Sequence, residues 1–202
     1  MTWVKVCGLR TEAEVAVAID AGADAVGFVL APSPRYVAAD VVARLVVDVP
    51  VATYLVTVDL HPDEVEPLLR RTGATGLQPH GAHAVAAATV ATLCGAQVLL
   101  PVPVTERVRP GSVGAGFRPL LDTPSVQHGG TGRSFDWALI DADGAEFVLA
   151  GGLGPDTVAR AIAVVRPWGV DASSGLEARP GRKDPAKIRA FVAAATQTED
   201  VT

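Results

Sequence analysis

Leu149-Ala-Gly-Gly-Leu-Gly-Pro-Asp156 and Gly169-Val-Asp-Ala-Ser-Ser-Gly175 share one pattern, a short apolar strand that breaks into glycine or serine at its end. The first stretch then predicts a helix with Pro155 and Asp156 in its first turn. Glycine and serine leave backbone N–H groups accessible, and a helix start beside them attracts anions. Either loop alone would be read as an ordinary tight turn. As a pair after the last two strands, they predict the phosphate site of a (β/α)₈ barrel.

Apolar strands alternate with helical segments along the rest of the chain. We expect one α/β domain over residues 1–202, a (β/α)₈ TIM barrel whose fifth helix, within residues 105–117, is weak or missing. An open doubly wound sheet is the competing layout, but the Cys7-Gly8 turn lacks the glycine fingerprint of such sheets. Thr11 and Glu14 predict a capping box on the first helix. The expected strands are residues 3–9, 25–30, 52–58, 76–81, 97–104, 118–122, 146–150 and 169–172, and a short helix is expected over 135–140.

Composition excludes several classes of protein. Hydrophobic residues make up 49% of the 202 residues, which suffices for a substantial core. The net charge of −5 argues against a nucleic-acid partner. Cys7 and Cys94 are too far apart in sequence for a disulfide framework or a zinc motif. Since Lys5 interrupts the first apolar run and no run is long enough to span a bilayer, we expect a cytoplasmic protein with no membrane partner.

Polar side chains collect at the predicted strand ends. The carboxyl ends of parallel barrel strands lie on one face, where the active sites of such barrels are found. Each candidate also has a plainer interpretation: Cys7 as an inert buried thiol, Arg35 as a surface charge, His80 as a packing residue and Asp171 as a loop cap. The candidate site on this face consists of Cys7, Arg35, Gln78, His80, Asp122, Gly151, Gly152, Asp171, Ser173 and Ser174.

An ordered set of motifs from residue 3 to about residue 191 resembles the phosphoribosylanthranilate isomerases of tryptophan biosynthesis. Each motif alone is weak, but their order is highly specific. The motifs are Val4-Lys-Val-Cys-Gly-Leu9, Gly22-Ala-Asp-Ala-Val-Gly-Phe28, Ser33-Pro-Arg-Tyr-Val37, Leu121-Asp-Thr123, Gly129-Gly-Thr-Gly132, Phe135-Asp-Trp137, Leu149-Ala-Gly-Gly152, Val170-Asp-Ala-Ser-Ser-Gly175 and Pro180-Gly-Arg-Lys-Asp184.

The resemblance implies an Amadori rearrangement of N-(5-phosphoribosyl)anthranilate, with no metal and no cofactor. It makes Cys7 the general base, Asp122 the general acid and Arg35 the partner of the anthranilate carboxylate. The other assignments are to the two binding subsites. Gln78, His80 and Asp171 are assigned to substrate binding, and Gly130, Gly151, Gly152, Ser173 and Ser174 to phosphate binding.

The residue types suit this chemistry. A carboxylic acid can protonate the ring oxygen of a furanose if its pKa is raised, and a thiolate can take the neighbouring C2 proton if its pKa is lowered toward neutrality. Two alternatives stay open: an aminoaldose phosphosugar isomerase of histidine biosynthesis, which usually pairs two carboxylates, and a non-catalytic barrel scaffold. The sequence allows a monomer or a homodimer.

Overall fold

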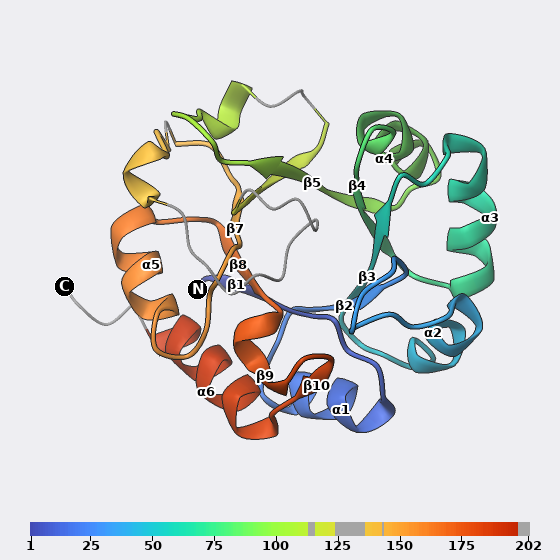
Figure 1. Cartoon of the computed structure of the whole chain (residues 1–202), viewed down its shortest axis with the longest axis horizontal. Coiled ribbons are helices and arrows are strands. Elements are labelled where there is room, and N and C mark those ends of the chain that lie inside the picture. The colour runs from blue at the N-terminus through green and yellow to red at the C-terminus, as the bar shows by residue number, and fades with distance from the viewer. Residues whose placement is uncertain (113–115, 124–135, 143, 198–202) are drawn as a thin grey trace.

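The computed structural model describes residues 1–112, 116–123, 136–142 and 144–197, and its strands form a closed parallel barrel (Figure 1). Each strand pairs with the next one along the chain and the last pairs with the first, so the barrel sheet has no open edge. The predicted (β/α)₈ architecture is confirmed. The barrel strands are β1 (Trp3–Cys7), β2 (Ala25–Val29), β3 (Ala52–Val58), β4 (Gly76–His80), β5 (Gln97–Pro103), β6 (Arg118–Asp122), β7 (Val148–Leu149) and β8 (Gly169–Ala172).

Helices surround the barrel, but the described residues include no α-helix between β5 and β6 or between β6 and β7. Among the described residues, only the 3₁₀ turn η1 (Pro110–Ser112) lies between β5 and β6, as expected for a weak or missing fifth helix, because proline lacks the N–H that a helix needs. Only the 3₁₀ turn η2 (Trp137–Leu139) represents the helix predicted over 135–140. The α-helices are α1 (Glu12–Asp20), α2 (Ala39–Leu45), α3 (Pro62–Thr72), α4 (Ala84–Leu93), α5 (Val158–Val165) and α6 (Pro185–Thr196).

The start of α1 forms only half of the predicted capping box. Thr11 Oγ1 accepts a hydrogen bond from the Glu14 N–H at 3.2 Å, as predicted. Glu14 Oε2 accepts from the Arg10 N–H at 2.7 Å instead of the Thr11 N–H, and Glu14 Oε1 accepts from the Lys183 N–H at 3.1 Å. Glu14 therefore ties the first helix to the C-terminal part of the chain.

The helix after β7 begins later than predicted. Pro155 and Asp156 lie in a turn ahead of α5, because the Thr157 and Val158 N–H groups both donate to the Gly154 carbonyl. Pro155 and Asp156 are therefore not first-turn residues, and that prediction is wrong. Because α5 starts later, the glycine-containing loop between β7 and α5 is longer than a direct strand-to-helix turn.

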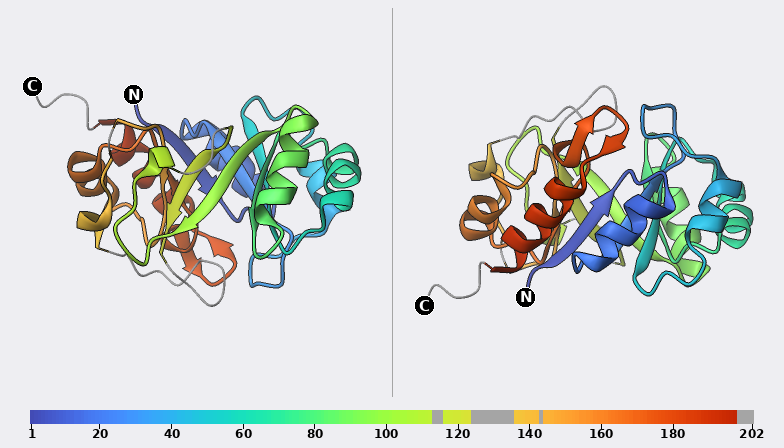
Figure 2. Two further views of the ribbon diagram at one scale, coloured as in Figure 1. Left: turned by 90° about the horizontal axis from the view of Figure 1, so that it is seen from above. Right: turned by 90° about the horizontal axis from the view of Figure 1, so that it is seen from below.

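A two-stranded hairpin follows β8, where the sequence predicts only a loop. Its strands β9 (Glu177–Arg179) and β10 (Arg182–Lys183) pair antiparallel. The tip packs so tightly against the loop after β2 that a Cβ on Gly181 would lie 2.1 Å from the Pro34 carbonyl oxygen. The side views place the orange-red hairpin at the end of the barrel opposite the N-terminus, which is the carboxyl end of the strands (Figure 2).

Alternation along β1 separates the two faces of the barrel wall. Val4 and Val6 are fully buried in the core between barrel and helices, whereas Lys5 and Cys7, two residues apart, point to the barrel interior. At the amino end of the strands, Trp3 stacks on Trp168 with ring centroids 5.0 Å apart. The open end of the interior is therefore the carboxyl end, where Cys7 lies.

Candidate active site

A cavity of about 330 Å³ opens at the carboxyl end of the barrel strands. Every site residue predicted from the sequence lines it, apart from Gly130, which lies outside the described residues. Residues from most of the strands meet there because a closed parallel barrel brings all its carboxyl ends together. The predicted residues that line the cavity are Cys7, Arg35, Gln78, His80, Asp122, Gly151, Gly152, Asp171, Ser173 and Ser174.

Cys7 occupies the last position of β1 and is 5% exposed. Burial raises the pKa of the Cys7 thiol, and the negative charge of Asp171 raises it further. Lys5 and Lys183 lower that pKa without cancelling the effect of burial. A thiolate base is favoured when the thiol pKa is lowered toward neutrality, and burial shifts the pKa of Cys7 the other way.

Asp122 occupies the last position of β6 and faces the same cavity. Burial raises the pKa of Asp122 to about 6, against the opposing effect of the Thr123 N–H, which donates to Asp122 Oδ1 at 2.7 Å. The charge of Asp171 adds to the rise, and that of Lys5 reduces it. A large fraction of Asp122 is therefore a carboxylic acid at mildly acidic pH, as a proton donor requires. The neighbouring loop must come close, since a Cβ on Gly151 would lie 3.1 Å from Asp122 Oδ1.

Lys5 is a site residue that the sequence analysis did not assign. Its side chain is fully buried inside the barrel, with Nζ 2.9 Å from Asp171 Oδ2 and 2.8 Å from Gln78 Oε1. Burial opposes the charge of Lys5, but Asp171 and Cys7 outweigh it, so the pKa of Lys5 lies above its ordinary value. A signal was available in the sequence, because Lys5 is a charged residue in an apolar strand and shares a face with Cys7.

Gln78, His80 and Asp171 form the wall beside Cys7. Pro79 interrupts β4 between Gln78 and His80 but keeps both on the cavity side, where Gln78 Nε2 lies 3.2 Å from His80 Nε2. Asp171 Oδ2 binds Lys5, whereas Asp171 Oδ1 is buried and has no hydrogen-bond partner among the described residues. Since Asp171 lines the cavity, Oδ1 is an acceptor available to an N–H or O–H group of a bound molecule.

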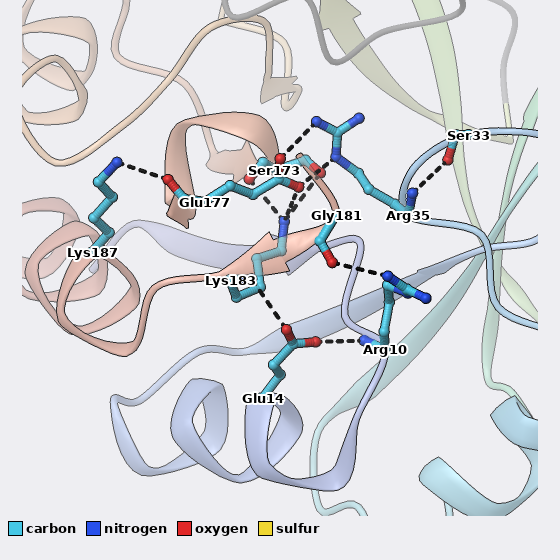
Figure 3. Close-up of polar contacts among 9 residues, drawn as sticks. All are labelled: Arg10, Glu14, Ser33, Arg35, Ser173, Glu177, Gly181, Lys183 and Lys187. Atoms are coloured by element: carbon cyan, nitrogen blue, oxygen red, sulfur yellow. Dashed lines mark hydrogen bonds and ion pairs between the residues drawn. The ribbon is translucent and has the colours of Figure 1, made fainter. Parts of the chain in front are cut away.

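Arg35 joins the cavity to the hairpin after β8 (Figure 3). Its Nε donates to Glu177 Oε1 at 2.6 Å and its Nη2 to Glu177 Oε2 at 3.0 Å, a two-point ion pair that fixes the plane of the guanidinium. Among the described residues, none accepts a hydrogen bond from Arg35 Nη1, so this nitrogen can still bind a ligand. Glu177 was not anticipated from the sequence, because 142 residues separate it from Arg35.

Lys183 connects Glu177 to the loop after β8 (Figure 3). Its buried Nζ donates to the Ser173 carbonyl at 2.8 Å and lies 3.3 Å from Glu177 Oε1. Burial lowers the pKa of Lys183, and the charge of Glu177 opposes that effect. A buried lysine therefore contacts the predicted phosphate loop. The sequence does not place this lysine near the loop, because Lys183 follows Ser173 by ten residues.

Two glycines shape the loop after β7. Gly151 and Gly152 have φ of 86° and 68°, in the left-handed region that glycine adopts without strain. Among the described residues, none accepts a hydrogen bond from the backbone N–H of Gly152 or of Ser174. Both groups lie at the cavity, so they are available to an anion.

The described residues include neither a membrane-spanning helix nor a cluster of metal ligands. No helix there combines the length and apolar character needed to cross a bilayer. No group of three or more histidine, cysteine, aspartate or glutamate side chains in that part of the chain is arranged to hold a metal ion.

Comparisons with known proteins agree on one family. A family model described as N-(5'phosphoribosyl)anthranilate (PRA) isomerase matches residues 4–194. The N-(5'-phosphoribosyl)anthranilate isomerase of Halobacterium salinarum is 40% identical over 222 residues, covering 100% of this chain and 99% of that protein. Phosphoribosyl anthranilate isomerase from Thermus thermophilus has a TM-score of 0.85 and 30% identity, over 96% of this chain and 98% of that one. A phosphoribosyl anthranilate isomerase in complex with reduced 1-(o-carboxyphenylamino)-1-deoxyribulose 5-phosphate has a TM-score of 0.78 and 31% identity, with the same coverage of 96% and 98%.

Proposed function

The chain belongs to the N-(5'-phosphoribosyl)anthranilate isomerase family and catalyses the isomerisation of that compound, and we propose that Cys7 and Asp122 perform its acid–base steps. The observation that carries the proposal is that both side chains line one cavity, with accessible backbone N–H groups at one of its edges. The relative solved with a carboxyphenylamino sugar phosphate supports the substrate class. Arg35 suits the carboxylate of such a molecule, and the loops of Gly152 and Ser174 suit its phosphate.

The proposed reaction moves protons within the substrate. Asp122, as a carboxylic acid, protonates the ring oxygen of the ribose, and the ring opens as C1 forms an iminium with the anthranilate nitrogen. Cys7, as a thiolate, takes the proton from C2, and the resulting enol rearranges to the ketone. C2 is oxidised and C1 is reduced, so no external oxidant or reductant takes part. Asp171 Oδ1 accepts a hydrogen bond from the amine or a ribose hydroxyl in this proposal, which is supported by its lack of another partner among the described residues.

An assay of anthranilate fluorescence tests this function directly. Adding the protein should deplete the signal of N-(5'-phosphoribosyl)anthranilate with turnover. A parallel reaction with the aminoaldose of histidine biosynthesis measures any side activity, which the thiol at the end of β1 disfavours, because that chemistry usually pairs two carboxylates. Binding without turnover would instead indicate the non-catalytic scaffold.

We predict a bell-shaped pH dependence of kcat/KM in which the acidic limb reports Asp122 and the basic limb reports Cys7. Catalysis needs Asp122 protonated and Cys7 ionised, yet the pKa of Asp122 is about 6 and burial raises that of Cys7 above its ordinary value of 9.0. Between the two pKa values, each rise in pH increases the fraction of Cys7 that is ionised and decreases the fraction of Asp122 that is protonated by the same factor. The product of the two fractions, and with it kcat/KM, therefore stays constant. Below the Asp122 pKa only the thiolate fraction keeps falling, and above the Cys7 pKa only the acid fraction does. Only a minor protonation state therefore reacts.

Steady-state kinetics from about pH 4.5 to about pH 10.5 check this ordering. Asp122→Asn should move the acidic limb up to the thiol pKa, because the thiolate fraction alone then limits the rate. A wild-type acidic limb that stays in place in Asp122→Asn would contradict the assignment.

The phosphate subsite gives a second prediction. Gly152→Val should raise KM about tenfold or more, which corresponds to about 1.4 kcal/mol, because a branched side chain would strain the positive φ and cover the free N–H. Inorganic phosphate should also lose its ability to compete with substrate.

The control for this change is Arg179→Ala in β9. Arg179 is exposed and does not line the cavity, so its removal should leave KM within about twofold, as expected for a screened surface charge. If the arginine change weakens phosphate competition more than the glycine change does, phosphate is bound by basic side chains rather than by backbone N–H groups.

A further inference from the structure

Lys5 is a fully buried charge for which the proposed acid–base steps have no use. Its side chain does not line the cavity but lies beneath it, inside the barrel. An ammonium group in such a place is costly unless its N–H groups find acceptors. Its partners therefore indicate what the charge does.

The Lys5 ammonium has one N–H donor that is not used by Asp171 or Gln78. A lysine carries three N–H donors, and Lys5 uses two of them on Asp171 Oδ2 and Gln78 Oε1, at 2.9 and 2.8 Å. Cys7 follows two residues later on the same face of β1. A Cβ on Gly27 of the neighbouring β2 would lie 2.8 Å from Cys7 Sγ and 3.2 Å from Lys5 Cε. The absence of a side chain at Gly27 thus lets the thiol and the lysine stem pack side by side.

The charges around Cys7 come from several elements. Lys5 on β1 and Lys183 on β10 favour the thiolate, whereas Asp171 on β8 opposes it, and Lys5 has the largest effect of the three. Asp122 on β6, His80 on β4 and Arg35 after β2 face the same cavity. Lys5 is fully buried and Lys183 is nearly so, and neither water nor salt screens the charge of Lys5 effectively.

We propose that Lys5 is a positioning residue whose ammonium, beneath the cavity, holds Asp171 and Gln78 in the cavity wall and supplies the positive charge against which the Cys7 thiolate forms. Lys5 binds Asp171 Oδ2 and leaves Asp171 Oδ1, which has no hydrogen-bond partner among the described residues, as a remaining acceptor of this carboxylate. This inference rests on the assignment of Cys7 as the base. Its test therefore measures the thiol itself as well as turnover.

The test is Lys5→Met, which keeps the length of the side chain and removes the charge. In a Cys94→Ala background, Cys7 is the only cysteine, and its rate of alkylation by iodoacetamide is followed against pH. The midpoint should move up by at least about one pH unit, so that alkylation at pH 8 slows about tenfold. The basic limb of the kcat/KM profile should be displaced upward, and the acidic limb should also move up, because the charge of Lys5 lowers the pKa of Asp122.

Lys187→Met is the matched control. Lys187 lies on α6, outside the cavity, and its Nζ binds the Glu177 carbonyl. This variant should alkylate Cys7 with the wild-type pH dependence. A folded Lys5→Met protein with an unchanged alkylation midpoint would overturn the proposal and leave Lys5 a purely structural ion pair.

A second comparison applies if Lys5→Met does not fold, since it leaves Asp171 buried without a partner. Asp171→Asn and the Lys5→Met/Asp171→Asn double variant remove that unpaired charge. Adding Lys5→Met to Asp171→Asn should raise the alkylation midpoint, and identical midpoints would refute the role of Lys5. Cys7→Ser tests the base assignment through turnover alone, so a failure of the assignment and a failure of the Lys5 proposal give different results.

Discussion

Cys7→Ser is expected to abolish turnover, with kcat lowered by about 10⁴-fold, the upper end of the range for general acid–base catalysis. A serine hydroxyl is far less acidic than a thiol, so it supplies almost no conjugate base at any pH at which the protein is folded. The substitution is small, and the other residues that line the cavity are retained. Substrate should therefore still bind, and the loss should be in kcat rather than in KM.

Two measurements make this result decisive. Binding of substrate to the inactive variant can be followed by the change in anthranilate fluorescence, separately from turnover. Cys94→Ser is the matched control, because Cys94 is exposed at the end of α4 and should have no effect on either quantity. A loss of only a few-fold in Cys7→Ser would remove Cys7 from the mechanism.

Asp122→Asn should lower kcat by about 10²–10⁴-fold. Asparagine preserves the shape of the side chain, and its carbonyl oxygen can still accept the Thr123 N–H bond, but it cannot transfer a proton to the ring oxygen. The ribose ring then has to open without acid assistance. Steady-state kcat and the equilibrium binding of substrate, measured on the same preparation, separate this chemical effect from a change in affinity.

The control for Asp122→Asn is Asp156→Asn. Asp156 carries the same functional group at an exposed position in the turn before α5, so it should keep wild-type kcat. If Asp122→Asn also kept near-normal kcat, water or another group would protonate the ring, and the pKa of about 6 would have no catalytic meaning.

The two carboxylates at strand ends have different environments, which explains why we assign the proton donor to Asp122. Asp171 contacts a fully buried lysine, whose ammonium nitrogen lies 2.9 Å from Asp171 Oδ2. Asp122 has no cation within ion-pair distance among the described residues and is governed by burial, which raises its pKa. The sequence positions of Asp122 and Asp171 do not reveal this difference in environment, because both are aspartates at strand ends.

Much of the fold and most of the candidate site followed from the sequence alone. Apolar runs that end in polar residues predicted the strands. A strand that is buried on both faces consists of continuous apolar side chains, whereas polar side chains are tolerated at its carboxyl end. The end of a strand can be recognised from the local sequence. Because a closed parallel barrel brings the carboxyl ends of all its strands together, residues at those ends lie close to one another. Cys7 and Asp122 therefore line one cavity although they lie far apart in the sequence.

Tertiary structure alone decided the electrostatics. The ion pair of Lys5 with Asp171 joins residues 166 positions apart, and the pair of Arg35 with Glu177 joins residues 142 apart, so no local pattern announces either. The upward shifts of the Cys7 and Asp122 pKa values depend on burial and on distances to charged groups, which exist only once the barrel has closed. Sequence periodicity determined which residues face the cavity, because periodicity sets side-chain direction. Charge and solvation within the cavity depend on packing between distant segments, and only the folded chain determines them.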